Sequence, residues 1–275
     1  MMCIHWRRGR HYGVAAFAIC LLATTALVHA DPIFRYSLPD SWSGPPATSV
    51  VDLSATGNNA KLAGTPALSA SIPPGADPAT QSLDSHSGGF QTLATGLLNN
   101  AAIAAAGGFV FDLSFIWDGT AGNFSVQKII DYAGTESLQI GNLDTTIGTA
   151  NLHFQFDDDP LNGVDLPILA NTWYDVVAEF DTLGNAIAVD GSIAGVASLT
   201  VNGVSISGPA TKTTQGDVLN RPIGIGNFSI AGGIIELNGL IHDPSVSLVP
   251  EPTSWMLLTL GGLMLGGFKG RRSRC

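Results

Sequence analysis

The densest group of oxygen-bearing side chains falls near the middle of the chain. Four carboxylates and one amide lie within nine residues, and they belong to Asp157, Asp158, Asp159, Asn162 and Asp165. This set suits Ca²⁺, which takes about 6–8 oxygen ligands. The spacing is not that of an EF-hand, because no glutamate closes the loop and the required glycine is misplaced. The segment predicts a calcium site or, as the simpler interpretation, a solvated acidic hairpin loop.

A second candidate group lies on one expected strand, residues 173–180. Trp173, Asp175 and Glu179 alternate there with apolar residues, so they share the polar face of the strand. An aromatic ring next to carboxylates is a common arrangement in sugar-binding surfaces. The pattern therefore indicates a candidate glycan-binding face.

Other catalytic arrangements are absent from the sequence. His86, His153 and His242 are far apart and show no His-x-x-x-His spacing, which argues against a catalytic zinc. There is no Gly-x-Ser-x-Gly elbow and no phosphate-binding loop. The three cysteines lie at the two ends, at Cys3, Cys20 and Cys275. We therefore expect no thiolate nucleophile, no disulfide in the central region and no catalytic residue.

The charge of the chain is unevenly distributed. The sequence has 22 acidic and 12 basic residues, yet residues 31–252 hold five basic residues against all 22 acids, a formal net charge of −17. Nucleic-acid binding would require clustered Lys and Arg, so it is not expected. With 45% apolar and 12% charged residues, the chain is also too hydrophobic to be disordered.

The N-terminal end has the order of a secretory signal peptide. Arg7, Arg8 and Arg10 precede a fifteen-residue apolar run, residues 14–28, and Val28-His29-Ala30 supplies small residues for cleavage. The alternative is a membrane anchor, but a spanning helix needs about 20 apolar residues. We expect residues 1–30 to be handled by the Sec translocon and removed by signal peptidase.

The C-terminal end, residues 249–275, has three parts in a fixed order. A Pro-Glu-Pro sequence is followed by an apolar stretch, residues 255–268, and then by a basic cluster. Fourteen residues of helix reach about 21 Å, so a short transmembrane helix would need its flanking residues or a thinner bilayer to span. By the positive-inside rule the basic cluster would stay in the cytoplasm.

This end resembles the PEP-CTERM sorting signal of Gram-negative bacteria that make exopolysaccharide. The resemblance implies recognition by an exosortase, transient anchoring in the inner membrane, and release to the cell envelope or the extracellular matrix. It assigns the sorting motif and the basic retention signal to Pro250, Glu251, Pro252, Arg271, Arg272 and Arg274.

The central part, residues 31–248, is expected to be an all-β domain. Gly, Pro, Ser and Thr recur about every ten residues, and apolar residues alternate with polar ones in several short runs. In residues 109–117 every second side chain is Phe, Leu or Trp, which predicts one core face ending in Trp117. Asn202-Gly203 predicts a tight hairpin. Residues 97–106 are expected to form an exposed turn or a loop. The pattern predicts a two-sheet β-sandwich.

Four motifs, in order, resemble LamG-like, concanavalin A-type jelly-roll domains. They are Val51–Ala60 (VDLSATGNNA), Trp173–Ala178 (WYDVVA), Leu199–Gly203 (LTVNG), and Ile223–Gly226 (IGIG) with Asn238–Ile241 (NGLI). The resemblance implies a jelly roll, interrupted by an extra Gly-rich segment at residues 181–197. Some relatives are glucanases with a Glu-x-Asp-x-x-Glu strand, which Glu179 and Asp181 begin, but the run continues with Gly184-Asn185 and supplies no third carboxylate.

The sequence as a whole predicts an exported, non-catalytic module of the cell envelope or extracellular matrix, with a glycan-binding or structural role. The alternative is a glucanase-like polysaccharide hydrolase on the same fold. Calcium is the one cofactor that the residues suggest. Polysaccharide, the membrane, signal peptidase, the Sec translocon and an exosortase are the expected partners.

Overall fold

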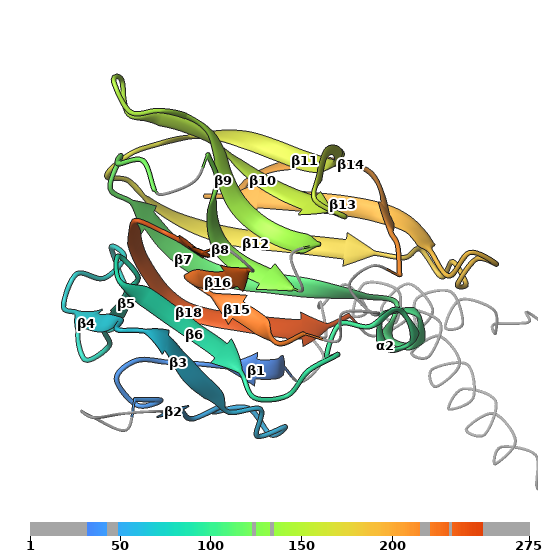
Figure 1. The fold of residues 1–275 in the computed structure, drawn as a ribbon, viewed down its shortest axis with the longest axis horizontal. Coiled ribbons are helices and arrows are strands. Elements are labelled where there is room, and N and C mark those ends of the chain that lie inside the picture. Colours follow the sequence, from blue (N-terminus) through green and yellow to red (C-terminus); the bar gives the residue numbers. More distant parts are fainter. Residues whose placement is uncertain are drawn as a thin grey trace, which may run out of the picture.

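The computed structural model describes residues 32–42, 49–122, 125–132, 135–214, 221–230 and 233–249. Within these residues the chain forms a sandwich of two eight-stranded antiparallel sheets, with one short helix at one end (Figure 1). The all-β two-sheet prediction is therefore confirmed. The segments that carry the signal-peptide and sorting-signal predictions lie outside the described residues. Among the described residues, no helix has the length and apolar character needed to cross a membrane.

The first sheet, called the β7 sheet, has the strand order β14-β13-β12-β7-β18-β5-β4, and β1 pairs with β18 at its side. The bounds in this order are β14 (Val204–Lys212), β13 (Ile193–Val201), β12 (Trp173–Asp181), β7 (Gly108–Trp117), β18 (Gly239–Leu248), β5 (Ser82–Asp84), β4 (Ala67–Ser69) and β1 (Pro32–Arg35).

The second sheet, called the β9 sheet, has the order β11-β10-β9-β8-β15-β6-β3-β2. The bounds in this order are β11 (Asp159–Leu169), β10 (Thr149–Phe156), β9 (Glu136–Asp144), β8 (Gln127–Tyr132), β15 (Ile223–Ile225), β6 (Gly88–Thr92), β3 (Ala60–Gly64) and β2 (Ser49–Val50). A separate hairpin, β16 (Asn227–Ile230) with β17 (Gly233–Glu236), lies against β8.

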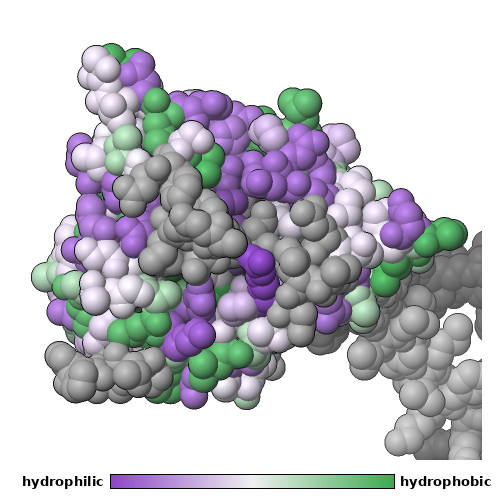
Figure 2. Space-filling model, viewed as in Figure 1, coloured by the Kyte–Doolittle hydropathy of each residue, from purple (hydrophilic) through white to green (hydrophobic). Residues whose placement is uncertain are grey.

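Aromatic side chains fill the space between the two sheets. Phe109, Phe111, Leu113, Phe115 and Trp117 all point inward from β7 and are buried, as their alternation predicts. Their rings meet those of the other sheet, for example at 6.0 Å between the ring centroids of Phe109 and Phe154. Burying one such side chain stabilises the fold by about 1.5–3 kcal/mol. In the view of Figure 2, the apolar side chains that remain outside are scattered among polar ones.

The Asn202-Gly203 hairpin forms as predicted. Val201 and Val204 are paired residues at the end of β13 and the start of β14. The two turn residues have φ angles of 48° and 81°, the left-handed values that a two-residue type I′ turn requires. The expected Gly-rich insertion begins as a loop after β12, but from Ile193 it joins β13, so part of it is regular sheet.

The prediction for residues 97–106 was wrong, because the structure has a helix there, α2 (Asn100–Ala106). The Asn99 side chain accepts an amide N–H in the first turn, and Gly107 ends the helix at a φ of 93°. Ile103 is fully buried against the end of the sandwich. Two caps and one anchoring side chain are enough to fix a single short helix in this context.

The motif at residues 51–60 serves the fold rather than a ligand. Both carboxylate oxygens of Asp52 accept hydrogen bonds, including backbone N–H groups of Arg35 at 2.9 Å, Ser54 at 2.8 Å and Asn58 at 2.7 Å. Burial alone would raise the pKa of Asp52, but these bonds outweigh it and lower the pKa. Asp52 thus ties β1 to the segment between β2 and β3.

Candidate functional site

A hollow of about 600 Å³ lies on the outer face of the β7 sheet, where β1, β7, β12 and β18 meet. We call it the β7-sheet hollow. The residues of β7 that alternate with the buried aromatic ones point into it. Its chemically active side chains are Arg35, Asp112, Ser114, Asp175, His242 and Asp243.

The position of Asp175 in the hollow is fixed by its neighbours. Asp175 on β12 stands opposite Ser114 on β7, and the Ser114 hydroxyl donates to Asp175 Oδ1 at 2.6 Å. The backbone N–H of Asp175 donates to the side chain of Asn202 at 2.8 Å. Asp112 lies two residues from Ser114 along β7, opposite Val177, so it is the diagonal neighbour of Asp175 on the same face. Two carboxylates therefore share one wall.

A β-bulge in β18 adds the remaining polar groups. The register of β18 against β7 shifts between His242 and Ser245, and Asp243 has a φ of 45°. Bulges of this kind re-aim side chains and are frequent beside functional sites. His242 is 5% exposed and its Nε2 lies 2.9 Å from the Thr80 hydroxyl oxygen.

Asp243 Oδ1 is a buried oxygen with no hydrogen-bond partner among the described residues. Leaving such an acceptor unsatisfied costs about 1–3 kcal/mol, and more when it carries charge. A ligand with a hydroxyl group could supply the missing donor. Within the hollow, this is the observation that points most directly to a ligand.

The three predicted glycan-binding residues share a face but do not converge. Trp173, Asp175 and Glu179 all lie on the outer face of β12, as predicted. Asp175 is the one that lines the hollow. Four residues of strand separate it from Glu179, or about 13 Å at about 3.3 Å per residue. The sequence therefore identified the face and one residue of this hollow.

The acidic segment at residues 157–165 forms the turn between β10 and β11 and the start of β11. Its side chains have different partners: Asp157 contacts Thr213, Asp158 contacts Gln155, Asp159 the N–H of Leu161, Asn162 the backbone of Thr211, and Asp165 contacts Asn151. One contact lies within the segment, where the Asn162 amide donates to Asp157 Oδ2 at 3.4 Å. In the described part of the chain, no three His, Cys, Asp or Glu side chains gather as a metal-binding group. The acidic hairpin turn is observed, and the calcium site stays a prediction.

A second depression, of about 680 Å³, lies on the outer face of the β9 sheet. We call it the β9-sheet groove. Gln139, Asn142, His153, Gln155 and Asp158 are among its lining residues. Asp158 belongs to the predicted calcium segment, whereas the other four were not predicted to bind a ligand, although His153 and Gln155 alternate with core residues on β10. That alternation is the signal that could have identified them.

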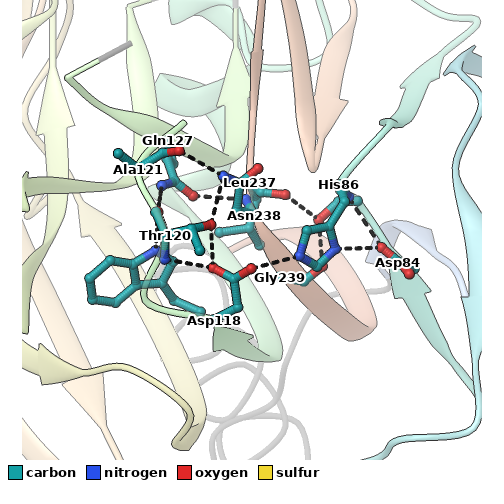
Figure 3. Close-up of polar contacts among 11 residues, drawn as sticks. Asp84, His86, Asp118, Thr120, Ala121, Gln127, Leu237, Asn238 and Gly239 are labelled. Carbon is teal, nitrogen blue, oxygen red and sulfur yellow. Dashed lines mark hydrogen bonds and ion pairs between the residues drawn. The ribbon is translucent and has the colours of Figure 1, made fainter. Parts of the chain in front are cut away.

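His86 is held by two carboxylates at the edge of the β7 sheet (Figure 3). Its Nδ1 lies 2.6 Å from Asp84 Oδ1 and its Nε2 lies 2.8 Å from Asp118 Oδ2. Partial burial would lower the pKa of His86, but the hydrogen bonds and charges of Asp118 and Asp84 outweigh it and raise the pKa. Because both ring nitrogens are engaged, this imidazole acts as a clamp rather than as a general base or a metal ligand.

Asp118 connects the clamp to the loop that follows β7. Its Oδ1 accepts from the backbone N–H and the hydroxyl of Thr120, both at 2.7 Å. Thr120 in turn bonds Gln127 and Asn238 (Figure 3). The network joins the ends of several strands. Its polar side chains bond to one another, so their clustering does not indicate a ligand.

All six residues of the predicted sorting signal lie outside the described residues: Pro250, Glu251, Pro252, Arg271, Arg272 and Arg274. Their role stays a prediction.

No protein-family model matches the chain, and no curated protein matches it by sequence. Among solved structures it is similar to domain 4 of AbnA, a GH43 extracellular arabinanase from Geobacillus stearothermophilus, in complex with arabinotriose. The identity is 13% and the TM-score 0.45, over 80% of this chain and 94% of that one.

The chain is also similar to two binding domains of botulinum neurotoxins. For neurotoxin DC, in complex with rat synaptotagmin II, the identity is 13% and the TM-score 0.46, over 85% of this chain and 52% of that one. For the binding domain of serotype G the identity is 11% and the TM-score 0.46, over 82% of this chain and 49% of that one. The chain spans about half the length of these neurotoxin domains. Similarity at such low identity and TM-score gives no information about a ligand.

Proposed function

We propose that the chain is a non-catalytic jelly-roll module of an exported envelope or matrix protein, and that a glycan binds in the β7-sheet hollow. The observation that carries this proposal is the buried Asp243 Oδ1, which has no donor in the described chain and belongs to a residue that lines the same hollow as Asp175 and Ser114. Sugar hydroxyl groups are donors that carboxylates bind well, and hydrogen bonds to charged groups are the stronger ones.

The composition of the hollow favours a neutral, hydroxyl-rich ligand. Three carboxylates, Asp112, Asp175 and Asp243, face one guanidinium, that of Arg35, so an anionic ligand would be repelled. Pro73 and Pro74 add apolar surface against which the C–H face of a sugar ring can pack. Ligand sites typically have a volume of about 300–1,000 Å³ and combine apolar lining with a few polar groups, and this hollow is of that kind.

A hydrolase remains the alternative, and one observation favours it. Asp112 and Asp175 are diagonal neighbours on adjacent strands, a relation that places side chains about 7–8 Å apart. Inverting glycosidases hold their two carboxyls about 6.5–9.5 Å apart. However, catalysis also needs one carboxyl that is held protonated and donates its proton as the acid, whereas Asp175 accepts a hydrogen bond from the Ser114 hydroxyl.

A glycan-array screen with and without Ca²⁺, followed by calorimetry on the best hit, tests the proposal. We expect Asp175→Asn and Asp243→Asn each to weaken binding roughly tenfold or more, the loss expected for hydrogen bonds to charged groups. Asp190→Asn is the matched control, because this exposed carboxylate does not line the hollow. Wild-type protein that binds no glycan under either condition would leave a structural role, and release of reducing ends would favour the hydrolase.

Export and sorting are part of the same proposal and are supported by the terminal motifs of the sequence. Glu251 is the charged residue of the Pro-Glu-Pro motif. We expect Glu251→Gln to slow removal of the C-terminal tail, seen as a larger mature protein on immunoblots of cell fractions. Asp190→Asn is again the control. Processing at the wild-type rate would contradict a role of that carboxylate in recognition.

A further inference from the structure

The β9-sheet groove lies on the face of the sandwich opposite to the β7-sheet hollow. Leu138, Leu152 and Phe154 point from β9 and β10 into the shared core. The residues between them, including Gln139 and His153, therefore point outward from the β9 sheet. The two depressions, of about 600 and 680 Å³, open in opposite directions.

The floor of the groove consists of paired polar side chains. Gln139 on β9 stands directly opposite His153 on β10, and the next pair on the same face is Ser137 with Gln155. Gln139 is 4% exposed, His153 9% and Gln155 3%, although all three are on the outer face of a sheet. Such burial of polar groups on an outer face indicates a built depression rather than ordinary solvated surface.

A glycine gives this floor its depth beside His153. A Cβ atom at Gly141 would lie 3.1 Å from the imidazole ring, closer than nine in ten real contacts. The imidazole Nε2 lies 3.5 Å from the Asn142 amide nitrogen. The missing side chain of Gly141 therefore leaves the space that the His153 ring occupies.

The hydrogen bonds within the floor leave capacity for a ligand. The Ser137 hydroxyl donates to Gln139 Oε1 at 3.2 Å, and Gln155 Nε2 donates to Asp158 Oδ1 at 3.2 Å. Each amide has two donor hydrogens and one acceptor oxygen, so Gln139 and Gln155 both have further bonds to offer. Such mixed donors and acceptors match hydroxyl groups, which are themselves both.

The charges in the groove are balanced internally. The Lys128 ammonium lies 3.1 Å from Asp131 and 3.8 Å from Asp158, and its side chain is 4% exposed. Burial lowers the pKa of His153, against a smaller opposite effect of Asp165, and so favours the neutral ring. The groove thus offers no uncompensated cation to an anionic polymer. Val126, Leu143 and Pro160 add apolar lining.

We propose that the β9-sheet groove is a second saccharide site, and that one protein molecule bridges two neutral glycans, one on each face of the sandwich. The bridging part rests on the proposed function of the β7-sheet hollow. Sheets in a sandwich pack about 10 Å apart and the two sites face away from each other, so a short oligosaccharide occupies one site at a time. A polysaccharide would instead be cross-linked.

Calorimetry on the full chain with cellohexaose, xylohexaose and laminarihexaose as neutral probes tests this proposal. We expect two sugars bound per chain, or two probes that each bind once at different sites. Gln155→Ala should weaken one binding event roughly tenfold, and Asp175→Asn the other. Ser125→Trp, at an exposed position of the groove rim, blocks the groove without touching the core and guards against misfolding of the Gln155 variant.

Bridging has its own measurement. Wild-type chain should make a soluble glucan or xylan solution turbid, and each single-site variant should bind the polymer without turbidity. If wild type binds one sugar and Asp175→Asn alone abolishes this binding, the second site is wrong and the proposed function stands. If wild type binds one sugar and Ser125→Trp alone abolishes it, both bridging and a glycan site in the β7-sheet hollow are wrong. If no probe binds, both proposals are wrong.

Discussion

Glu136 and Lys212 form a buried ion pair that links the two sheets. Glu136 begins β9 and Lys212 ends β14, both side chains are fully buried, and Oε1 lies 3.3 Å from Nζ. The Thr135 hydroxyl donates to the other oxygen at 2.6 Å. The cost of desolvating a buried pair can exceed the attraction between its charges, and it does so here, because burial is the largest effect on Glu136 and raises its pKa. We therefore predict that Glu136→Gln, whose amide resembles the protonated carboxyl, has a stability close to that of wild type at low pH and is the more stable protein above pH 7.

The same pair should make stability depend on pH in a defined direction. Burial raises the pKa of Glu136 to about 7, although Lys212 and Thr135 oppose the rise. Between an unfolded value of 4.5 and about 7, the folded chain holds a proton that the unfolded chain releases. The contribution is complete below pH 4.5 and is lost as the pH rises through 7. It amounts to roughly 3 kcal/mol, at about 1.4 kcal/mol for each pH unit.

Urea unfolding of wild type and Glu136→Gln at pH values from 4.5 to 8 measures both effects. The difference in unfolding free energy between the two proteins should change by roughly 3 kcal/mol over this range, with wild type relatively more stable at low pH. The double variant Glu136→Gln with Lys212→Met is the control, and it should be at least as stable as the single variant because no buried charge stays unpaired. Parallel pH curves for wild type and Glu136→Gln, or a double variant less stable than the single one, would refute the reasoning.

Three further variants test other parts of the framework. Asp52→Asn should lose about 1–3 kcal/mol in urea unfolding at pH 7, and less at low pH, because the lowered pKa makes the contribution of this carboxylate fall with acidity. His86→Gln should lower the unfolding free energy at pH 5–6 by less than about 1 kcal/mol, since the ring is 42% exposed. Above the raised pKa of His86 it should have no effect, because the neutral ring no longer attracts the charges of Asp84 and Asp118. Phe109→Ala should lower the unfolding free energy by about 3–5 kcal/mol at any pH, and a loss below 1 kcal/mol would contradict its place in the core.

Local patterns in the sequence predicted the parts of the fold that depend on near neighbours. Alternation identified the inward face of β7 up to Trp117, and turn chemistry identified the Asn202-Gly203 hairpin. The helix α2 was missed although its caps, Asn99 and Gly107, stand in the sequence. One buried isoleucine, rather than a repeated apolar stripe, holds it in place.

The candidate sites were less accessible from sequence, because they depend on which strands become neighbours. Asp175 was found from its own strand, but Ser114 is its partner through the pairing of β12 with β7. Asp243 enters the hollow through a shift of register in β18, which leaves no periodic signal. In the acidic segment, composition alone could not distinguish convergent carboxylates from carboxylates that each bind a different partner.

The bond between Asn162 and Thr211 has a consequence for the behaviour of the chain at high concentration. β11 and β14 are the last strands of their sheets on the same side, where unpaired backbone groups could recruit another molecule. The Asn162 side chain donates to the Thr211 carbonyl at 2.7 Å and accepts from its N–H at 2.8 Å, as a neighbouring strand would. One amide thereby closes a stretch of open sheet edge, which protects the chain from strand-to-strand aggregation at high concentration.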